Sequence, residues 1–174
     1  MVSLKGEHVF LRALEPEDLD FVYEIENDTA LWSLSDTLTP YSRFTLKQYL
    51  ENAQQDIFEA KQLRLAICIN SGATIGLIDV FDFDIKNKRA GIGILIKDEA
   101  HRYKGYGSEA LDLLVNYCFK TLHLHQVYAN ILESNVNSLK LFEHRGFKKI
   151  GLKEDWSFDG KHYCNEFLLQ RINR

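Results

Sequence analysis

The stretch "HRYKGYGSEALDLLVNYCF" (His101 to Phe119) places two glycines, Gly105 and Gly107, directly ahead of an apolar run with helical spacing. Glycines in front of a helix allow main-chain N–H groups to curl around an anion, which the positive end of the helix dipole also attracts. The stretch therefore predicts a helix that begins near Gly105 and holds a phosphate group of a ligand at its N-terminus.

Several kinds of phosphate-binding loop contain such glycines. A P-loop is excluded because no Gly-Lys-Ser or Gly-Lys-Thr ends the stretch. "GYGSEA" (Gly105 to Ala110) does satisfy the dinucleotide pattern G-x-G-x-x-A, but that motif directly follows the first strand of a βαβ unit. Here the polar stretch "KDEAHR" intervenes, and the following strand lacks an acidic residue for the ribose. A dinucleotide enzyme stays as an alternative, as does a glycine loop that only starts a helix.

Length and composition are those of an ordinary globular chain. The 174 residues are 45% apolar and 26% charged, which predicts one domain covering 1–174. The net charge of −4 argues against a nucleic-acid surface and leaves room for a cationic substrate. The three cysteines, Cys68, Cys118 and Cys164, lack CxxC spacing, which favours free thiols in a reducing, cytoplasmic compartment. No signal-peptide core and no apolar run of about 20 residues is found, so no membrane contact is predicted.

Hydrophobic periodicity predicts an α+β domain with the order β-α-α-β-β-β-α-β-α-β-β. Strands are expected over residues 8–14, 62–69, 73–84, 89–96, 126–132, 147–153 and 161–169. Helices are expected to start near Pro16, near Thr45 with an apolar face that reaches Ile57, near Gly105, and over 135–145, while 28–43 forms a loop. Three closely linked strands predict an antiparallel meander, and the strand after the long helix predicts a parallel crossover.

"RYKGYG" (Arg102 to Gly107) resembles the [RQ]-x-x-G-x-G/A pyrophosphate loop of the GNAT superfamily of acyl-CoA-dependent N-acyltransferases. "ESNVNSLKLFEHRGFKKIG" (Glu133 to Gly151) is similar to the second signature of that superfamily. The opening from Val9 to Asp28 resembles the branch that contains ribosomal-protein N-terminal acetyltransferases and spermidine acetyltransferases. The resemblance covers nearly the whole chain. It implies a mixed, mostly antiparallel sheet with flanking helices that is splayed between its fourth and fifth strands.

The resemblance also implies a cofactor site for acetyl-CoA, as co-substrate, without a metal. The residues expected to bind the pyrophosphate through their amides are Arg102, Tyr103, Lys104, Gly105, Tyr106, Gly107 and Ser108. The main chain of Ile94, Leu95 and Ile96 would pair with the pantetheine arm, and the Leu95 amide would stabilise the oxyanion. Asn135, Ser138 and Phe142 would contact the rest of the arm, and Asn135 equally suits the N-cap of its helix.

Phe142 departs from the family pattern, because many members have a tyrosine there that protonates the leaving thiolate. The pKa of a coenzyme thiol is close to that of free cysteine, about 8.5. At pH 7 its thiolate is therefore less stable than its thiol by about 2 kcal/mol. Deprotonating an alkylamine with a pKa of about 10.4 costs about 4.6 kcal/mol at the same pH. Removing the amine proton is therefore the larger problem, and Tyr128, Ser138 or a water could replace the tyrosine.

The general base and the substrate contacts are less well marked. Some relatives have a glutamate on the splayed strand, but "RAGIGILI" has no carboxylate, so Asp79 and Glu133 are the candidates. Each could equally be a solvated surface residue. Trp32 and Asp82 are the candidate substrate contacts, although Trp32 could instead pack under its loop and Asp82 could belong to a solvated hairpin.

We therefore expect an acetyl-CoA-dependent N-acetyltransferase that acts on a primary amine, either a small molecule or a peptide N-terminus, by direct attack. The spermidine branch carries a Glu-rich stretch after its first helix, whereas this chain has Asp36 with Arg43 and Lys47, which argues against a polyamine acceptor. The alternative is an acyl-CoA-binding module with weak or no catalysis. The resemblance is also compatible with a homodimer.

Overall fold

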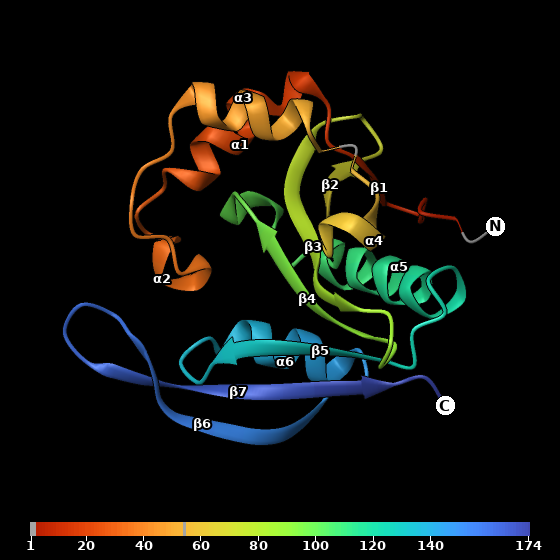
Figure 1. The fold of residues 1–174 in the computed structure, drawn as a ribbon, viewed down its shortest axis with the longest axis vertical. Helices are drawn as coiled ribbons and strands as arrows, with labels where there is room; N and C mark the ends of the chain where they lie inside the picture. Colours follow the sequence, from red (N-terminus) through yellow and green to blue (C-terminus); the bar gives the residue numbers. More distant parts are fainter. Residues whose placement is uncertain (1–2, 54) are drawn as a thin grey trace.

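A seven-stranded mixed sheet with helices on both faces organises the chain (Figure 1). The computed structural model describes residues 3–53 and 55–174. The strands are β1 (Val9–Ala13), β2 (Leu63–Ile69), β3 (Thr74–Asp84), β4 (Arg89–Ile96), β5 (Gln126–Leu132), β6 (Lys148–Phe158) and β7 (Tyr163–Ile172). Their order is β1-β2-β3-β4-β5-β7-β6, and every neighbouring pair is antiparallel except β4 and β5. The predicted α+β class, meander and parallel crossover are confirmed.

The helices divide between the two faces of the sheet. They are the 3-10 turn η1 (Pro16–Asp18), α1 (Leu19–Glu26), α2 (Trp32–Ser35), α3 (Arg43–Glu51), α4 (Ile57–Ala60), the 3-10 turn η2 (Glu99–His101), α5 (Tyr106–Lys120) and α6 (Val136–His144). Residues of α5 pack on one face together with Leu65 and Ile67 of β2. Residues of α1 and α3 pack on the other face with Ala66 and Cys68. Strand β2 is thus apolar on both faces, because successive side chains point to opposite sides.

Strands β4 and β5 separate after a short paired stretch. Their ladder joins Arg89, Ala90 and Gly91 to residues 126–128 and stops there, whereas β4 stays paired with β3 as far as Ile96. Figure 1 shows β4 and β5 diverging toward their carboxyl ends. The predicted splay between the fourth and fifth strands is confirmed.

Gly91 stands at the last paired position for a packing reason. A Cβ atom there would lie 2.2 Å from the Phe81 ring, whose edge-to-face partner is Tyr128. The close approach that a strand glycine indicates is therefore to a neighbouring side chain of the same sheet.

Several predicted elements differ from the observed ones. The second helix ends at Glu51, and Ile57 opens a separate helix that Asp56 caps by accepting a hydrogen bond from the Phe58 amide. The expected loop over 28–43 contains α2, which a tertiary contact of Trp32 holds. Strand β6 runs on to Phe158. The sequence did not predict this extension, because an edge strand with mostly exposed side chains lacks the apolar and polar alternation of a half-buried strand.

None of the helices in the described part of the chain is long and apolar enough to cross a membrane.

Candidate functional site

The loop before α5 presents unused main-chain donors. Gly105 is the N-cap of α5 with φ +83°, a left-handed conformation that glycine adopts without strain. Within the described residues, the amides from Tyr103 to Ser108 donate to no acceptor of the protein. Three of them belong to the first turn of a helix of 15 residues, where the helix dipole favours an anion. The loop therefore has the donors that a pyrophosphate would need.

Two side chains fix this loop to its surroundings. The Arg102 guanidinium donates to the carbonyl of Ile96 at 3.1 Å and to that of Lys97 at 3.2 Å. The Tyr103 hydroxyl accepts a hydrogen bond from Asn137 Nδ2 of α6 at 2.7 Å. The loop is thus tied to the end of β4 on one side and to α6 on the other.

The first turn of α6 lies beside the open end of the splay. The side-chain oxygen of Asn135 accepts from the Ser138 amide at 3.2 Å, so its predicted role as N-cap is confirmed. Asn135, Ser138 and Phe142 all line one cavity. Phe142 is buried, with its ring centroid 4.9 Å from that of Phe147.

Alternate residues of β4 hydrogen-bond to β3, and this alternation decides which amides face the open splay. The Lys97 amide donates to the Ile75 carbonyl, and the register places Leu95 opposite Leu77. In an antiparallel ladder alternate residues point their main-chain groups at the partner, so Leu95 points at β3 and Ile94 points into the splay. The predicted oxyanion role of the Leu95 amide is therefore wrong. The sequence could not reveal this, because the phase depends on register.

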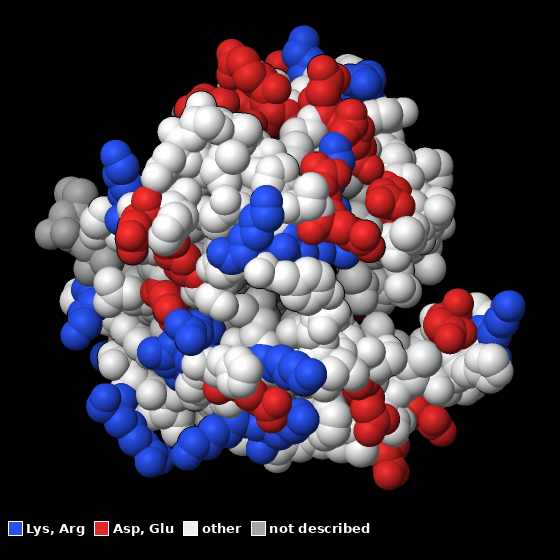
Figure 2. Space-filling view, turned by 180° about the vertical axis from the view of Figure 1, so that it is seen from behind, with Lys and Arg blue, Asp and Glu red and all other residues white. Residues whose placement is uncertain are grey.

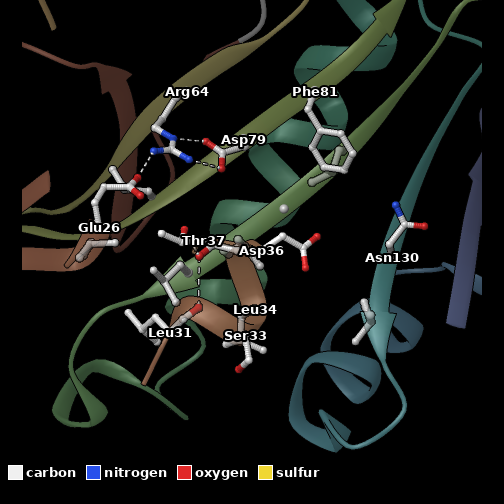
Figure 3. A pocket seen from close by; sticks show the side chains of 18 of the residues that line it. Glu26, Leu31, Ser33, Leu34, Asp36, Thr37, Arg64, Asp79, Phe81 and Asn130 are labelled. Carbon is white, nitrogen blue, oxygen red and sulfur yellow. Dashed lines mark hydrogen bonds and ion pairs between the residues drawn. The ribbon is translucent and has the colours of Figure 1, made fainter. Parts of the chain in front are cut away.

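A cavity of about 850 Å³ opens on the face of the sheet that carries α1, α2 and α3. Figure 3 shows α2 with Leu31 and Asp36 on one side of it and Asn130 of β5 on the other. Four carboxylates and two cationic groups belong to its lining: Glu26, Asp36, Asp79, Glu166, Arg64 and Lys153. The excess of negative charge suits a cationic group in the cavity.

One ion-pair network joins α1, β2 and β3 at this cavity (Figure 3). Arg64 Nε lies 2.7 Å from Asp79 Oδ1, and Arg64 Nη1 lies 2.7 Å from Glu26 Oε1. Burial alone would lower the pKa of Arg64, but the Asp79 carboxylate more than offsets this and raises it. Burial also raises the pKa of the adjacent Tyr49. The guanidinium thus holds two carboxylates in place at the cavity wall.

A second network lies on β6 and β7. Lys153 Nζ donates to Glu166 Oε1 at 2.5 Å and to Asn130 Oδ1 at 3.0 Å, and it lies 4.6 Å from the centroid of Trp156. Sequence reasoning missed Glu166, Lys153 and Trp156. Trp156 lies between the predicted strands 147–153 and 161–169, and no local pattern links Lys153 to Glu166.

Two of the three predicted catalytic residues lie outside the cavity lining. Tyr128 pairs with Gly91, where β4 and β5 are still joined, and its hydroxyl donates to Asp82 at 3.4 Å. Burial, and then the negative charge of Asp82, raise the pKa of Tyr128. Glu133 is exposed and accepts from Asn165 at 3.0 Å. Only Asp79 lines the cavity.

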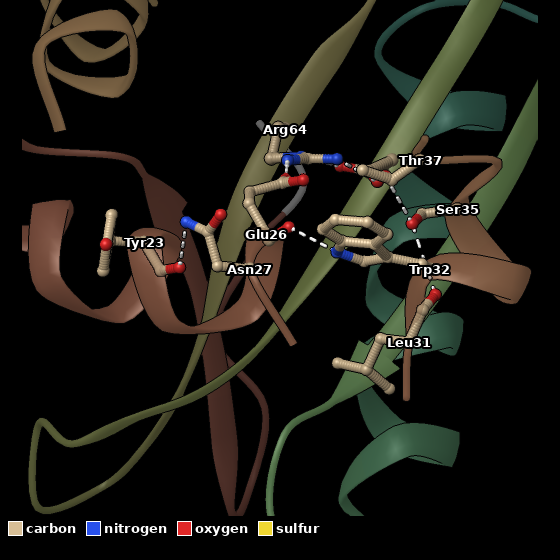
Figure 4. A network of polar contacts seen from close by, with 9 residues as sticks. Tyr23, Glu26, Asn27, Leu31, Trp32, Ser35, Thr37 and Arg64 are labelled. Carbon is tan, nitrogen blue, oxygen red and sulfur yellow. Dashed lines mark hydrogen bonds and ion pairs between the residues drawn. The ribbon is translucent and has the colours of Figure 1, made fainter. Parts of the chain in front are cut away.

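Trp32 has a structural contact that accounts for its position. Its indole Nε1 donates to the main-chain carbonyl of Glu26 at 2.9 Å, which fastens α2 to the end of α1 (Figure 4). Beside it, the Ser35 hydroxyl donates to the Leu31 carbonyl and lies within hydrogen-bond distance of the Thr37 hydroxyl. Trp32 itself is absent from the cavity lining, whereas its neighbours Leu31 and Ser33 belong to it.

Cys118, the cysteine nearest to the loop in sequence, is a poor nucleophile. Burial raises the pKa of Cys118 to about 12, so almost no thiolate forms at neutral pH. Within residues 3–53 and 55–174, no three His, Cys, Asp or Glu side chains gather as a metal site would require.

Comparisons with known proteins agree with this geometry. The family model "Acetyltransferase (GNAT) domain" matches residues 8–148. The chain is 28% identical over 153 residues to a spermidine N(1)-acetyltransferase of Vibrio cholerae, which covers 87% of this chain and 86% of that protein. It is also 28% identical to the uncharacterized N-acetyltransferase p20 of Bacillus licheniformis, over 100% of this chain and 98% of that one.

A solved structure has the same fold. The spermidine N-acetyltransferase from Vibrio cholerae in complex with CoA and spermine superposes with a TM-score of 0.85 at 22% identity, covering 94% of this chain and 95% of that one. The glycine loop, the splayed strands and the family match over most of the chain lead to one conclusion: this protein belongs to the GNAT acetyltransferase family and is an N-acetyltransferase.

Proposed function

We propose that the protein transfers an acetyl group from acetyl-CoA to a primary amine that binds in the carboxylate-lined cavity. The observation that carries this proposal is the placement of two complementary sites on the two sides of one splay. Unused amides of residues 103–108 suit the pyrophosphate on one side, and an anionic cavity suits an ammonium group on the other.

The proposed reaction is a direct transfer. The ammonium group loses a proton, and the amine nitrogen attacks the thioester carbonyl carbon to form the new C–N bond. The C–S bond then breaks, the CoA thiolate takes up one proton, and the nitrogen loses its second proton. One proton is released to solvent overall. Bringing the two reactants together is the main contribution of such a site.

Residues of the splay have proposed roles in these steps. The Ile94 amide, which points into the splay, replaces Leu95 as the donor to the developing oxyanion. Asp79 accepts a hydrogen bond from the attacking amine and receives its proton. Phe142 has no proton to give, so Ser138 or a water protonates the thiolate. Ser138 lines the same cavity as Asp79.

The acceptor is a primary amine of a small molecule or of a peptide N-terminus. A relative named as a spermidine acetyltransferase makes polyamines the first acceptors to compare with amino acids and short peptides. Among the residues at α2 that line the cavity, Asp36 is the one with a charged side chain, so a monoamine should compete well with a polyamine.

A combined binding and turnover experiment tests this function. Thermal shift with acetyl-CoA, CoA and NAD reports the cofactor, and release of free thiol reports transfer to each amine. Stabilisation by acetyl-CoA with amine-dependent thiol release is expected. Stabilisation without release across the amine panel would favour a binding module, and stabilisation by NAD alone would favour a dinucleotide enzyme. Ping-pong kinetics with an acetylated enzyme would exclude direct transfer.

The predicted cytoplasmic location remains a prediction. Cys68 and Cys118 are buried free thiols, and Cys164 is partly exposed and also free. Free thiols are typical of a reducing compartment.

A further inference from the structure

Five of the ionised side chains that line the cavity are enclosed. The side chains of Glu26 and Glu166 are 16% and 15% exposed. Those of Arg64, Asp79 and Lys153 are between 25% and 29% exposed. Charges enclosed in this way are screened by water and salt far less than charges on the surface. They therefore determine how much positive charge a ligand can bring into the enclosed part of the cavity.

Among the described residues, these enclosed groups leave one negative charge unmatched. Arg64 binds two of the carboxylates, through hydrogen bonds to Asp79 and Glu26, and Lys153 binds the third, on Glu166. Three carboxylates against two cations give a net charge of −1. A ligand with a single ammonium group would balance that charge, whereas a second ammonium group would be enclosed without a partner.

Large apolar side chains lie at the mouth of the cavity. Three lining residues are exposed there: Leu34 by 51%, Tyr41 by 39% and Trp156 by 62%. Asp36 also lines the cavity, but it is exposed, so water weakens its attraction for a second ammonium group. Trp156 belongs to the hairpin of β6 and β7 that projects beyond the body, at the lower left of Figure 1 and the lower right of Figure 2. Exposed apolar groups gathered at a cavity indicate contact with a ligand.

The surroundings of Trp156 favour an uncharged ligand group. Lys153 Nζ lies 4.6 Å from the centroid of the indole ring, and it is held there by hydrogen bonds to Glu166 and Asn130. The indole thus already has a cation against its ring. Lys153 would repel a second ammonium group at this position, whereas an uncharged ring could pack against the exposed part of the indole.

We propose that the acceptor is a primary amine with one positive charge on an apolar body that carries a ring, and that Trp156 selects this ring. The inference rests on the proposed function and names the substrate class of the same cavity. The ammonium group lies in the enclosed part near Asp79, and the ring contacts Trp156 and Leu34 at the mouth. Polyamines are then poor acceptors, because their further charges have no enclosed partner.

Thiol release from acetyl-CoA measures acceptor preference. The panel holds 2-phenylethylamine, 3-phenylpropylamine and 4-phenylbutylamine, which vary the distance from ammonium group to ring, with butylamine and spermidine as amines without a ring. The best phenylalkylamine should exceed both of these at least about tenfold in kcat/KM. Equal values, or spermidine as the best acceptor, would overturn this inference and leave acetyl transfer intact. The absence of thiol release with any amine would overturn the proposed function as well.

A peptide arm distinguishes two sources of the same chemistry. The dipeptide Phe-Ala-amide places an aromatic ring beside a peptide N-terminus. A kcat/KM above that of the best phenylalkylamine would assign the ring-bearing amine to a peptide, and a lower value would assign it to a small molecule.

Trp156→Ala tests the selecting residue. The KM for the best phenylalkylamine should rise about tenfold, while the KM for butylamine should change less than about twofold. The matched control is Phe158→Ala, since Phe158 lies on the same strand, is 60% exposed and does not belong to the cavity lining. It should change neither constant. An equal rise for both amines in Trp156→Ala would overturn the role of Trp156 as the selecting residue.

Lys153→Gln tests the charge balance. This variant removes one enclosed cation, so the ratio of kcat/KM for spermidine to that for the best phenylalkylamine should rise about tenfold. Lys149→Gln is the matched control, because Lys149 lies on the same strand and pairs with Glu143 outside the cavity lining. An unchanged ratio in a folded Lys153→Gln variant would overturn the argument that enclosed charge excludes polyamines.

Discussion

The two sides of the splayed sheet are built from different kinds of chain segment. On the side of α5, one continuous stretch of six residues, 103–108, supplies main-chain amides. On the side of α1 to α3, the cavity takes its charged side chains from α1, the residue after α2, β2, β3, β6 and β7. The proposed cofactor site is thus local in sequence, whereas the proposed acceptor site is assembled from residues far apart.

This difference explains why the two sites should respond differently to substitution. Main-chain donors remain whatever the side chain is, so the loop is sensitive mainly to added volume. The cavity depends on particular carboxylates and cations, so it is sensitive to charge. Three predictions use that contrast, beginning with the largest expected effect, and a fourth concerns a structural carboxylate outside both sites.

Asp79→Asn should lower kcat/KM for the amine about 100-fold, in the range of a lost general base. Arg64 keeps its contact with Glu26, so the variant should fold normally. Steady-state kinetics and thermal unfolding measure the two effects. Asp112→Asn, which removes an exposed ion pair with Arg145, is the matched control. A larger loss of kcat/KM in Asp82→Asn than in Asp79→Asn would contradict the proposed place of the acceptor site.

Gly107→Ala should weaken acetyl-CoA binding about tenfold, because a methyl group would enter the space between β4 and α6 that the pantetheine arm needs. The protein itself accommodates that Cβ, at 3.6 Å from Leu141 and 3.8 Å from Ile94, so its stability should not fall. Gly105→Ala gives the contrast. Its Cβ meets nothing within 4 Å, but the positive φ should reduce stability by about 1 kcal/mol. Calorimetric titration and unfolding would separate the two glycines, and unchanged binding in Gly107→Ala would argue against this cofactor path.

Phe142→Tyr should raise kcat several-fold by supplying a proton donor at the thiolate. The ceiling is about 30-fold, which corresponds to the roughly 2 kcal/mol needed to expel an unaided thiolate at pH 7. The matched control is Phe147→Tyr, since Phe147 is equally buried and is not part of the cavity lining. If kcat is unchanged in Phe142→Tyr while the variant still binds acetyl-CoA, thiolate protonation does not limit the rate.

Asp18→Asn should reduce the free energy of unfolding by about 1–2 kcal/mol at pH 7 without changing turnover. Burial acts to raise the pKa of Asp18, but hydrogen bonds from Arg12 and from the Glu15 amide outweigh it and lower that pKa. The carboxylate therefore stabilises the fold above its unfolded pKa of about 3.9, and this stability is lost as the pH falls through the lower folded value. Acid unfolding of the variant should show a weaker dependence on pH below 4, and a loss of turnover would contradict a purely structural role.

Much of the fold and the loop 102–108 could be predicted, because the sequence patterns that indicate them lie within short continuous segments. Strands 89–96 and 126–132 were predicted with the observed bounds, and Asn135 caps α6 as expected. The cavity could not be predicted in the same way. Arg64 meets Asp79 only because β2 and β3 pair in one register, and Lys153 meets Glu166 only because β6 and β7 pair in one register.

The sequence by itself determined the order of the elements, the glycine loop with its unused amides, and the absence of a tyrosine at Phe142. Each of these follows from neighbouring residues, whose backbone preferences and hydrophobic spacing act over a few positions. Tertiary structure alone decided that Ile94 rather than Leu95 faces the splay, that Tyr128 and Glu133 lie outside the cavity, and that Trp32 fastens α2. For the strand residues the physical reason is that register and the direction of the splay fix which side chains and amides meet, and a shift of one residue would reverse them. For Trp32 the reason is the fold of the chain between α1 and α2, which brings its indole to the Glu26 carbonyl.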